Sequence, residues 1–529
     1  MADGQLIHWF RNDLRLHDMP SLSLAMTKCS KLYPVYIFDK TGILEKRIGY
    51  NRLRYIIESL EDIDRTFKAS GGRLYVFCGE PTKIMKDLMT DWNITHLSYE
   101  DDIQPVWTDV ESSIQDFCRE RNVEIINKVS HTLYDPKDIL KANRGNPPVT
   151  YNVFCQVAQS LGPPPKPEPP LKFENIMLSN EEVLDSKIPS SPEDLGATME
   201  CPEQTNRIWR GGERKALELL NNRLQIEKDA AESGILMPNQ AQPDLLSPSM
   251  SLSAPLSMGC LSVRKFYWDL LNLHVSESMD YYDLDGFAGQ LFWREYFYAM
   301  CMNNPYYGEM LRNPICLSIA WEENDSMLEC WNEGKTGFPL IDAAVRQMRQ
   351  EGWIHHVARN AIACFLTRGD LWISWEEGFK TFMKYMIDAD FAVCAGNWMW
   401  VSSSAFENIL QCPSCVSPVT YLRRFDRSGN YIKKYIPELK NMPTQFVFEP
   451  WLAPLSIQES AGCILGKDYP LPIVNHDMAA TKSTEKMNAI KEKFLTKSVP
   501  LHCTPSSPAE TRIFMWLPEN CLDNLIPQN

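Results

Sequence analysis

Features that define several common protein classes are missing from this 529-residue sequence. No apolar stretch approaches the roughly 20 residues that a membrane-spanning helix needs. The opening residues, MADGQLIHWF, lack the basic segment and apolar run of a secretory signal. No Gly-x-Gly-x-x-Gly follows the first expected strand, which argues against NAD binding. These absences predict a cytoplasmic and nuclear protein that does not enter a membrane.

Basic charge and metal-binding patterns are also scarce. Lys and Arg number 53 against 68 Asp and Glu, for a formal net charge of −15. Nucleic-acid-binding proteins usually carry a basic surface, so DNA binding is expected to be weak or absent. The 16 cysteines are typical of reduced thiols in a chain of this kind. The single Cys-x-x-Cys, at 412–415, has no second Cys or His pair at zinc-finger spacing, and no metal site is predicted.

The first third of the chain alternates between two apolar patterns. Short apolar runs, typical of buried strands, occur at 5–10, 32–38, 73–78, 95–99 and 122–126. Helical spacing separates them, most clearly over 50–69. Strands that alternate with helices predict a parallel sheet with crossover helices. We therefore expect an α/β, Rossmann-like domain over residues 1–135.

The rest of the chain divides into a linker, a helical region and a tail. Residues 162–170, Gly-Pro-Pro-Pro-Lys-Pro-Glu-Pro-Pro, cannot form regular helix or sheet and lie in an expected interdomain linker over 136–204. Residues 205–495 are expected to form a large all-α domain. Its helical patterns cover 212–228, 260–274, 285–303, 338–366, 373–387 and 400–410. A short C-terminal regulatory tail with one helix is expected over 496–529.

The densest group of chemically active side chains is 388–400, Asp-Ala-Asp-Phe-Ala-Val-Cys-Ala-Gly-Asn-Trp-Met-Trp. Buried carboxylates are costly unless they are paired or hydrogen-bonded, so helix capping or a structural salt bridge is the simplest explanation for the two aspartates. Other unusual segments in the same domain weaken that explanation. They are Trp-Arg-Gly-Gly-Glu at 209–213, Ser-Leu-Ser at 251–253, Gln-Leu-Phe-Trp-Arg-Glu at 290–295, Thr-Gly-Phe-Pro-Leu-Ile-Asp at 336–342 and Gly-Trp-Ile-His-His-Val-Ala-Arg-Asn at 352–360.

These segments, in this order, resemble the flavin-binding domain of the cryptochrome/photolyase family. Residues 8–18, His-Trp-Phe-Arg-Asn-Asp-Leu-Arg-Leu-His-Asp, resemble the opening strand and turn of the same family. The resemblance runs over residues 5–495 and implies an α/β domain, a long interdomain segment and a helical domain that holds FAD. Whether the first domain also holds an antenna chromophore is left open.

The resemblance implies two groups of cofactor contacts, and the first surrounds the FAD diphosphate. Ser251 and Ser253 precede a helix and supply hydroxyl donors, which the helix N-terminus supplements. Arg223 matches a position near the phosphates, and Gln290 matches one that lines the cofactor.

The second group surrounds the flavin ring. Asp390 is expected to accept the N3–H of the ring, and Asn397 is expected to lie near N5. Asp388 is expected to pair with Arg359, so that neither charge is buried alone.

Cys394 matches the position that faces flavin N5. Photolyases and many animal relatives have Asn there, whereas Cys resembles the insect light-sensing branch. A buried thiol is a poor hydrogen-bond partner and stays neutral, so we expect the one-electron reduced flavin to remain an anionic semiquinone. A small core residue is the simpler explanation, and both can hold.

Four of the 15 tryptophans match the electron-transfer chain of the family. Trp398 is expected nearest the flavin, followed by Trp375, Trp321 and, outermost, Trp372. Trp372 and Trp375 are three positions apart in the sequence, which predicts neighbours on one helix face. Spacing alone does not distinguish such a chain from a packing stripe, and the assignment depends on the resemblance.

DNA repair and light signalling make different demands on this site. A photolyase flips the damaged bases into a pocket beside the flavin, and Glu295 matches an acid that contacts the lesion. The (6-4)-type enzymes, however, have His at the positions that match His356 and Asn360. One His cannot do the acid/base work of the pair. His356 is then either a flavin-adjacent group that couples light to the tail or a packed, satisfied histidine.

Phe514, Met515 and Trp516 resemble the tail motif that fills the lesion pocket of insect cryptochromes, although the middle aromatic is Met here. The sequence therefore predicts an FAD-dependent blue-light photoreceptor of the circadian clock, in which photoreduction through the tryptophans releases the tail. By resemblance, its partners are the clock protein Timeless, ubiquitin-ligase components and Period. The alternatives are a light-dependent DNA photolyase and a light-independent clock transcriptional repressor.

Overall fold

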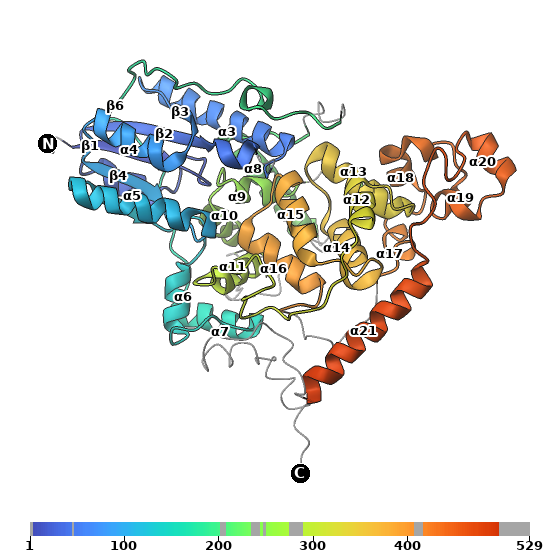
Figure 1. Cartoon of the computed structure of the whole chain (residues 1–529). Helices are drawn as coiled ribbons and strands as arrows, with labels where there is room; N and C mark the ends of the chain where they lie inside the picture. Colours follow the sequence, from blue (N-terminus) through green and yellow to red (C-terminus); the bar gives the residue numbers. More distant parts are fainter. Residues whose placement is uncertain are drawn as a thin grey trace, which may run out of the picture.

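A parallel sheet with its helices and a larger helical region lie side by side in this protein (Figure 1). The computed structural model describes residues 4–44, 47–201, 208–233, 244–246, 250–274, 289–406 and 416–496. Among these residues, no helix is both long and apolar enough to cross a membrane.

The sheet contains every strand that the sequence predicts. Its strands are β1 (Gln5–Phe10), β2 (Lys31–Asp39), β3 (Tyr75–Gly79), β4 (His96–Glu100), β5 (Glu124–Lys128) and the short β6 (Met177–Leu178). The first five are parallel in the order β3-β2-β1-β4-β5, and β6 pairs with β2. The chain therefore adds β2 and β3 on one side of β1 and then returns to add β4 and β5 on its other side, as in doubly wound α/β domains.

Helices cover both faces of this sheet. They are α1 (Pro20–Met26), α2 (Lys40–Leu44), α3 (Tyr50–Ala69), α4 (Pro81–Asp91) and α5 (Thr108–Arg121). Leu6 and Phe10 of β1 belong to the same core cluster as α1 and α3, whereas Ile7 and Trp9 pack with α4 and α5. Successive strand residues point to opposite faces, so the continuous apolar runs of the sequence are explained by burial on both sides.

The segment predicted to be an interdomain linker is partly helical. It contains α6 (Pro136–Ala142), α7 (Tyr151–Leu161), β6 and a 3-10 turn at Pro192–Leu195. Asp135 accepts the Lys137 N–H at the start of α6, and Thr150 accepts the Val153 N–H at the start of α7. These N-caps are local signals for helix initiation. The Pro-rich residues 162–170 have no regular structure, as predicted.

The second region is helical, as predicted. Its helices are α8 (Glu213–Ser233), α9 (Ser253–Ser257), α10 (Val263–His274), α11 (Gly289–Cys301), α12 (Asp325–Glu333), α13 (Pro339–Glu351), α14 (His356–Cys364), α15 (Trp375–Tyr385), α16 (Phe391–Val401), α17 (Thr420–Arg423), α18 (Asn430–Tyr435), α19 (Thr444–Val447), α20 (Leu455–Ala461) and α21 (His476–Thr496).

Two of the predicted helices have different bounds. The stretch 338–366 is divided at Gly352, which has φ +75° and whose added Cβ would lie 2.7 Å from Ile387 Cγ1. The helix predicted at 400–410 is wrong over residues 402–406, because α16 ends at Val401, and residues 407–410 lie outside the described residues. Ser403 and Phe406 then adopt φ +57° and +67°, a left-handed conformation that a helix cannot include.

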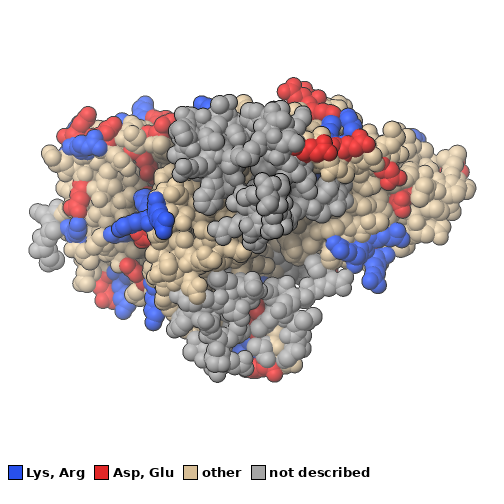
Figure 2. All heavy atoms as spheres, turned by 90° about the horizontal axis from the view of Figure 1, so that it is seen from below, with Lys and Arg blue, Asp and Glu red and all other residues tan. Residues whose placement is uncertain are grey.

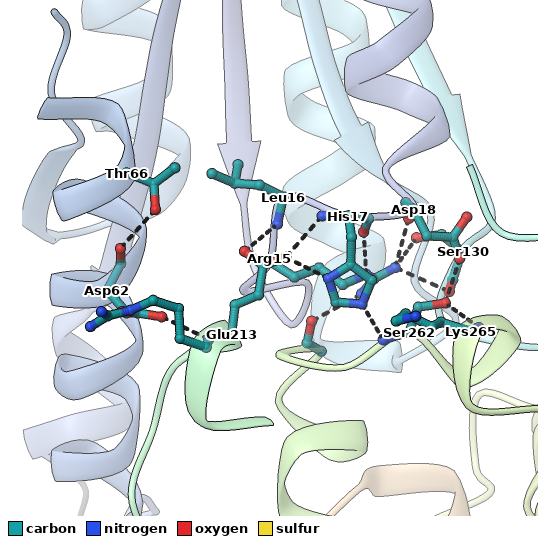
Figure 3. Close-up of polar contacts among 12 residues, drawn as sticks. Arg15, Leu16, His17, Asp18, Asp62, Thr66, Ser130, Glu213, Ser262 and Lys265 are labelled. Atoms are coloured by element: carbon teal, nitrogen blue, oxygen red, sulfur yellow. Dashed lines mark hydrogen bonds and ion pairs between the residues drawn. The ribbon is translucent and has the colours of Figure 1, made fainter. Parts of the chain in front are cut away.

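Two of the segments singled out in the sequence meet at the junction of the domains (Figure 3). Glu213, at the start of α8, accepts the backbone N–H groups of Leu16 and His17 at 3.0 Å each, and its carboxylate also contacts the His17 ring. Asp18, which is fully buried, pairs with Arg264 at 2.8 Å. The turn after β1 is therefore bonded to the helical region through paired charges.

Helix α3 forms a second contact between the domains. The Gly49 N–H, just before the helix, donates to the Lys384 carbonyl at 2.8 Å, and the Arg52 guanidinium donates to the Met383 carbonyl at 3.0 Å. One continuous apolar core joins the α3 face of the sheet to the helical region. The end of α15 is thus held directly by the α/β domain.

Candidate functional site

The N-terminus of α16 brings together the two aspartates of the 388–400 segment. Asp390 is the N-cap, and one of its oxygens accepts the Val393 N–H at 3.1 Å. The other oxygen accepts the Tyr298 hydroxyl and lies 3.5 Å from His131 Nε2. Burial opposes ionisation, but hydrogen bonds from His131 and Tyr298, together with the charge of Arg294, lower the pKa of Asp390 to about 2. Asp390 is therefore a carboxylate with protein donors on both oxygens.

Asp388 forms the ion pair that the sequence predicts. Both guanidinium nitrogens of Arg359 on α14 reach its carboxylate, at 2.8 and 3.2 Å. The Asp388 side chain is only 2% exposed, whereas that of Arg359 is 27% exposed. The pair is bidentate, a geometry in which arginine binds carboxylates well, and it fixes α14 against the start of α16.

Cys394 lies one turn into α16 and is half-buried. Burial raises the pKa of its thiol above the usual range, so the group is neutral. Asn397, in the next turn, is also half-buried, and its amide donates to the Val393 carbonyl at 2.8 Å. Helix α16 therefore presents an uncharged thiol and an amide on a partly open surface.

A tryptophan links the serine pair to this region. Ser251 Oγ lies 2.8 Å from Ser253 Oγ, and the indole N–H of Trp353 donates to Ser253 Oγ at 3.3 Å. The Arg359 guanidinium lies 5.8 Å from the centre of the Trp353 ring. Segments separated by more than a hundred residues thus form one connected group from Ser251 to Asp388.

The two histidines between α13 and α14 border the same region. His355 caps α14 by accepting the Val357 N–H, and its ring centre lies 4.3 Å from that of His356. Burial, followed by the nearby positive charges, lowers the pKa of His355 to about 4. Partial removal from water and the charge of Arg359 also lower the pKa of His356, which remains exposed. Both imidazoles are neutral at neutral pH.

Trp398 lies close to the helix that carries Trp375. A Cβ added to Gly378 of α15 would stand 2.1 Å from Trp398 Cη2, so the indole rests against the backbone of this helix. Gly378 is one turn beyond Trp375, and both tryptophans are buried. Within the described residues, neither indole N–H has a hydrogen-bond partner. Trp398 and Trp375 therefore lie in a buried, largely apolar environment.

Trp321 and Trp372 form a second pair, with ring centres 5.0 Å apart. The prediction that Trp372 shares a helix face with Trp375 is wrong, because α15 begins at Trp375 and Trp372 has φ +55°. This left-handed conformation is unusual for a bulky residue and indicates a position that its surroundings hold in place. Trp372 is 3% exposed, whereas Trp321 is half-buried, so the residue expected outermost is covered.

The sequence of this chain matches those of known proteins over nearly its whole length. Residues 287–489 match the family model of the FAD binding domain of DNA photolyase, and residues 6–170 match that of DNA photolyase. Cryptochrome-1 of Aedes aegypti is 47% identical over 97% of this chain and 98% of its own length. The chain belongs to the cryptochrome/photolyase family. Cryptochrome-1 of Drosophila melanogaster is 43% identical over the same shares.

Solved structures of the cryptochrome/photolyase family have the same architecture. A class III photolyase from Agrobacterium tumefaciens aligns with a TM-score of 0.76 and 25% identity over 93% of this chain and 98% of that one. A cryptochrome from Synechocystis aligns with a TM-score of 0.77 and 23% identity over 92% of this chain and 99% of that one. The resemblance seen in the sequence is confirmed, and the helical region is an FAD-binding domain.

The residues of this cryptochrome/photolyase-family site fit the cofactor chemically. The hydroxyls of Ser251 and Ser253 suit a phosphate, and the guanidinium, thiol and amide groups suit the edge of a flavin ring. These side chains are half-buried within a helical interior, which leaves one side of each accessible. They are Ser251, Ser253, Trp353, Arg359, Cys394 and Asn397.

For the other predicted residues, the structure gives the local surroundings and their role stays a prediction. Arg223 on α8 pairs with the buried Glu227 one turn later, at 2.7 Å. Gln290 is exposed in the first turn of α11. The tail residues Phe514, Met515 and Trp516 lie outside the described residues, and their predicted role stays a prediction.

A buried cluster, in which the sequence indicated Glu295 but not His131, contacts the start of α16. Glu295 accepts the Leu133 N–H at 2.7 Å and pairs with Arg294 at 2.9 Å. Burial raises the pKa of Glu295 to about 7 despite the Arg294 charge. Glu295 is thus bonded to the backbone that follows β5 rather than open to a lesion. The Trp-Arg-Glu motif pointed to this cluster, but no pattern around His131 did.

Proposed function

We propose that this protein is an FAD-dependent blue-light photoreceptor of the circadian clock, and that it does not act as a DNA-repair enzyme. The observation that carries the proposal is the neutral, half-buried Cys394 thiol between an already paired carboxylate and a tryptophan one turn further along α16. The side chains of such a site offer no ready proton when an electron arrives. The insect relatives that match over nearly the whole chain are named Cryptochrome-1.

FAD, when bound, supplies the absorption of blue light and the acceptance of one electron. Trp398 is the electron donor nearest the cofactor, and Gly378 allows its indole to approach α15, which carries Trp375. Trp321 and Trp372, with ring centres 5.0 Å apart, pass the positive charge further outward. Each step moves one electron inward between neighbouring indoles and requires no bond to break.

The groups at the start of α16 do not release a proton readily. The Cys394 thiol has a raised pKa, and Asp390 is already ionised at neutral pH. His356 has a lowered pKa and carries no extra proton to give. The negative charge that arrives on illumination therefore stays in place, and reorientation of His356 couples it to the C-terminal tail, which includes Phe514 to Trp516.

Repair activity is less well supported. Glu295, the match to a lesion-contacting acid, is 4% exposed and engaged by backbone N–H groups and Arg294. Asn360 stands where a (6-4)-type mechanism needs a second histidine. On the parts of the face in Figure 2 that are not drawn in grey, Lys and Arg side chains form separate groups among acidic and uncharged residues. A DNA-binding face usually has a continuous basic surface, so we propose that DNA binding is weak or absent.

The proposed partners are the clock protein Timeless, ubiquitin-ligase components and Period, in the cytoplasm and the nucleus. Light-dependent exposure of the tail and of the surface beneath it would recruit them. Trypsin cleavage near Arg512 tests this output, because faster cleavage in light than in darkness is expected. Equal cleavage under both conditions would remove the tail from the mechanism.

Absorption spectroscopy of the purified, FAD-loaded protein under blue light is the principal test. We expect photoreduction in the wild type and its loss in Trp398→Phe. Trp331→Phe is the matched control, because Trp331 is equally buried and its ring centre lies 6.3 Å from that of Trp398, but it is not one of the four. Light-driven repair of cyclobutane dimers or (6-4) products by the same preparation would contradict the proposed function.

Cys394→Asn tests the proton argument separately. An amide can hydrogen-bond at the position of the thiol, so the variant is expected to photoreduce and then take up a proton that the wild type does not. Proton uptake on illumination, measured with a pH indicator in weakly buffered solution, distinguishes the two. Equal proton uptake by both proteins would remove the special role of Cys394.

A further inference from the structure

Helix α21 covers the tryptophan that the sequence placed at the outer end of the electron-transfer chain. Trp372 packs in a small apolar cluster with Met487 of α21 and with Leu317 and Ile319. The ammonium group of Lys486, the preceding residue, lies 4.6 Å from the centre of the Trp372 ring. Figure 1 shows α21 along the outside of the helical region. This helix is the last described element of the chain and packs directly on Trp372.

Lys486 is held between an indole and a carboxylate. Glu322 Oε1 accepts from Lys486 Nζ at 2.5 Å and from Lys482 Nζ at 3.0 Å. The Lys486 side chain is 28% exposed, against 63% for Lys482. The Glu322 N–H donates to the Trp372 carbonyl at 2.8 Å, so the carboxylate and the indole are fixed to each other through the backbone. Of these two lysines, Lys486 is the one that faces the ring.

The first residue of α21, His476, is attached to the segment that carries Trp372. His476 Nδ1 lies 2.7 Å from Asp370 Oδ1, and the Asp370 side chain is fully buried. Asp370 precedes Trp372 by two residues, after the π-helical turn Phe365–Gly369. Helix α21 is thus held at its start by an ion pair and two to three turns later by Lys486 and Met487.

Oxidation of Trp372 would reverse one of these attachments. The face of a neutral indole attracts an ammonium group because its π-electrons are negative. An indole that has lost an electron is positive and repels the same ammonium at the same distance. The indole N–H of Trp372 donates to the Ala320 carbonyl at 3.0 Å, and a backbone carbonyl is not a base that can take the proton. The positive charge would therefore persist beside Lys486.

We propose that Lys486 senses the oxidation of Trp372 and converts it into a weaker attachment of α21. The electron lost by Trp372 moves inward to Trp321 and is balanced by the electron that FAD accepts, so no further reactant is needed. The inference rests on the proposed function, because it requires Trp372 to carry charge. It adds a second light-dependent output at the outer end of the electron-transfer chain, independent of His356.

Lys486→Met tests the inference, because methionine keeps the apolar stem and removes the charge. We expect time-resolved absorption of the FAD-loaded full chain to show a lifetime of oxidised Trp372 about tenfold longer than in the wild type, the factor that corresponds to about 1.4 kcal/mol at 25 °C. Hydrogen exchange of α21 should increase on illumination in the wild type but not in Lys486→Met. Lys482→Met is the matched control, since Lys482 shares Glu322 but has no contact with the ring.

The outcomes separate this inference from the proposed function. If the wild type forms no oxidised tryptophan in light, both are contradicted. If Trp372 is oxidised but Lys486→Met and Lys482→Met give the wild-type lifetime and the wild-type exchange of α21, only the sensing role of Lys486 is overturned. Lys486→Arg guards against misfolding, because it keeps the charge and should restore both the lifetime and the exchange.

Discussion

At the start of α16, ionised groups are buried and paired within the protein, whereas the pair of Glu322 with Lys486 beside Trp372 is partly exposed. Asp388 is 2% exposed in its pair with Arg359, while Glu322 is 49% exposed in its pair with Lys486. A buried pair cannot lose one partner without leaving the other charge unsolvated. An exposed pair can separate into water at little cost.

In the proposed function, this contrast assigns different tasks to the two regions. Around Trp398, the charges are fixed by pairing and the thiol is neutral. Around Trp372, the charges can rearrange when a new positive charge appears. We therefore propose that the inner region supports electron transfer without motion, and that the outer region moves in response to it.

Breaking the inner ion pair should have the largest effect. Arg359→Ala leaves Asp388 buried and unpaired, and we expect the free energy of unfolding to fall by about 3–5 kcal/mol, with loss of bound FAD. Chemical denaturation and the FAD content of the purified protein measure this. Arg427→Ala, at an exposed arginine in the same domain, should leave both unchanged. A fall of less than about 1 kcal/mol in Arg359→Ala would show that the inner pair behaves like a surface pair.

Crowding Trp398 should have a smaller effect on stability. Gly378→Ala places a Cβ where Trp398 Cη2 would be 2.1 Å away, so the indole or α15 must move. Overpacking of this kind costs about 1–3 kcal/mol, and the displaced indole should slow photoreduction. Lys380→Ala, on an exposed position of the same helix, controls for the change in helix sequence. Unchanged stability and photoreduction in Gly378→Ala would mean that the contact is easily relieved.

The inner region should also show two opposite pH dependences. The pKa of Glu295 is raised to about 7, so the folded protein holds a proton that the unfolded chain loses above about pH 4.5, and stability falls as the pH rises through that interval. The pKa of Asp390 is lowered to about 2, so its contribution is lost as the pH falls below about 4.

Glu295→Gln isolates the first of these dependences. The amide keeps an acceptor for the Leu133 N–H and does not ionise. Its free energy of unfolding should exceed that of the wild type by about 1–3 kcal/mol at pH 8 and should match it more closely near pH 5. Parallel curves for the two proteins across this interval would show that Glu295 does not titrate there.

Changing the outer pair should have the smallest effect. Glu322→Gln removes the carboxylate that holds two lysines of α21, and we expect less than about 1 kcal/mol of lost stability. The loss should shrink further at high salt, because exposed charges are screened. Thermal unfolding at low and high salt measures both quantities. A loss comparable to that in Arg359→Ala would abolish the distinction between the two regions.

The sequence predicted the helices and strands whose apolar pattern is regular. The strands and α3 follow from apolar runs and helical spacing, because burial on fixed faces determines both. The break at Gly352 also has a local signal, because glycine commonly ends a helix in the left-handed conformation, but the prediction of one helix over 338–366 did not use it. The left-handed backbone of Trp372 has no such local signal.

The candidate site was predictable where its residues belong to long sequence motifs of the family. The pairing of Asp388 with Arg359 followed from the family resemblance, and the structure contains it. The contact between His131 and Asp390 did not, because 259 residues separate them and His131 stands in no recognisable pattern. Sequence reasoning therefore identified the helices that form the site but missed the contact of His131 with the start of α16.

The apolar core that joins α3 to the helical region has a consequence for protein engineering. A chimera that exchanges the α/β domain between two relatives would replace Asn51 and Arg52, which donate to carbonyls at the ends of α13 and α15. Its boundary would cut through shared packing rather than between independent units. Functional exchanges should therefore carry the facing residues of α13 and α15 together with α3, and partial ones should refold poorly even when each half is native to its own parent.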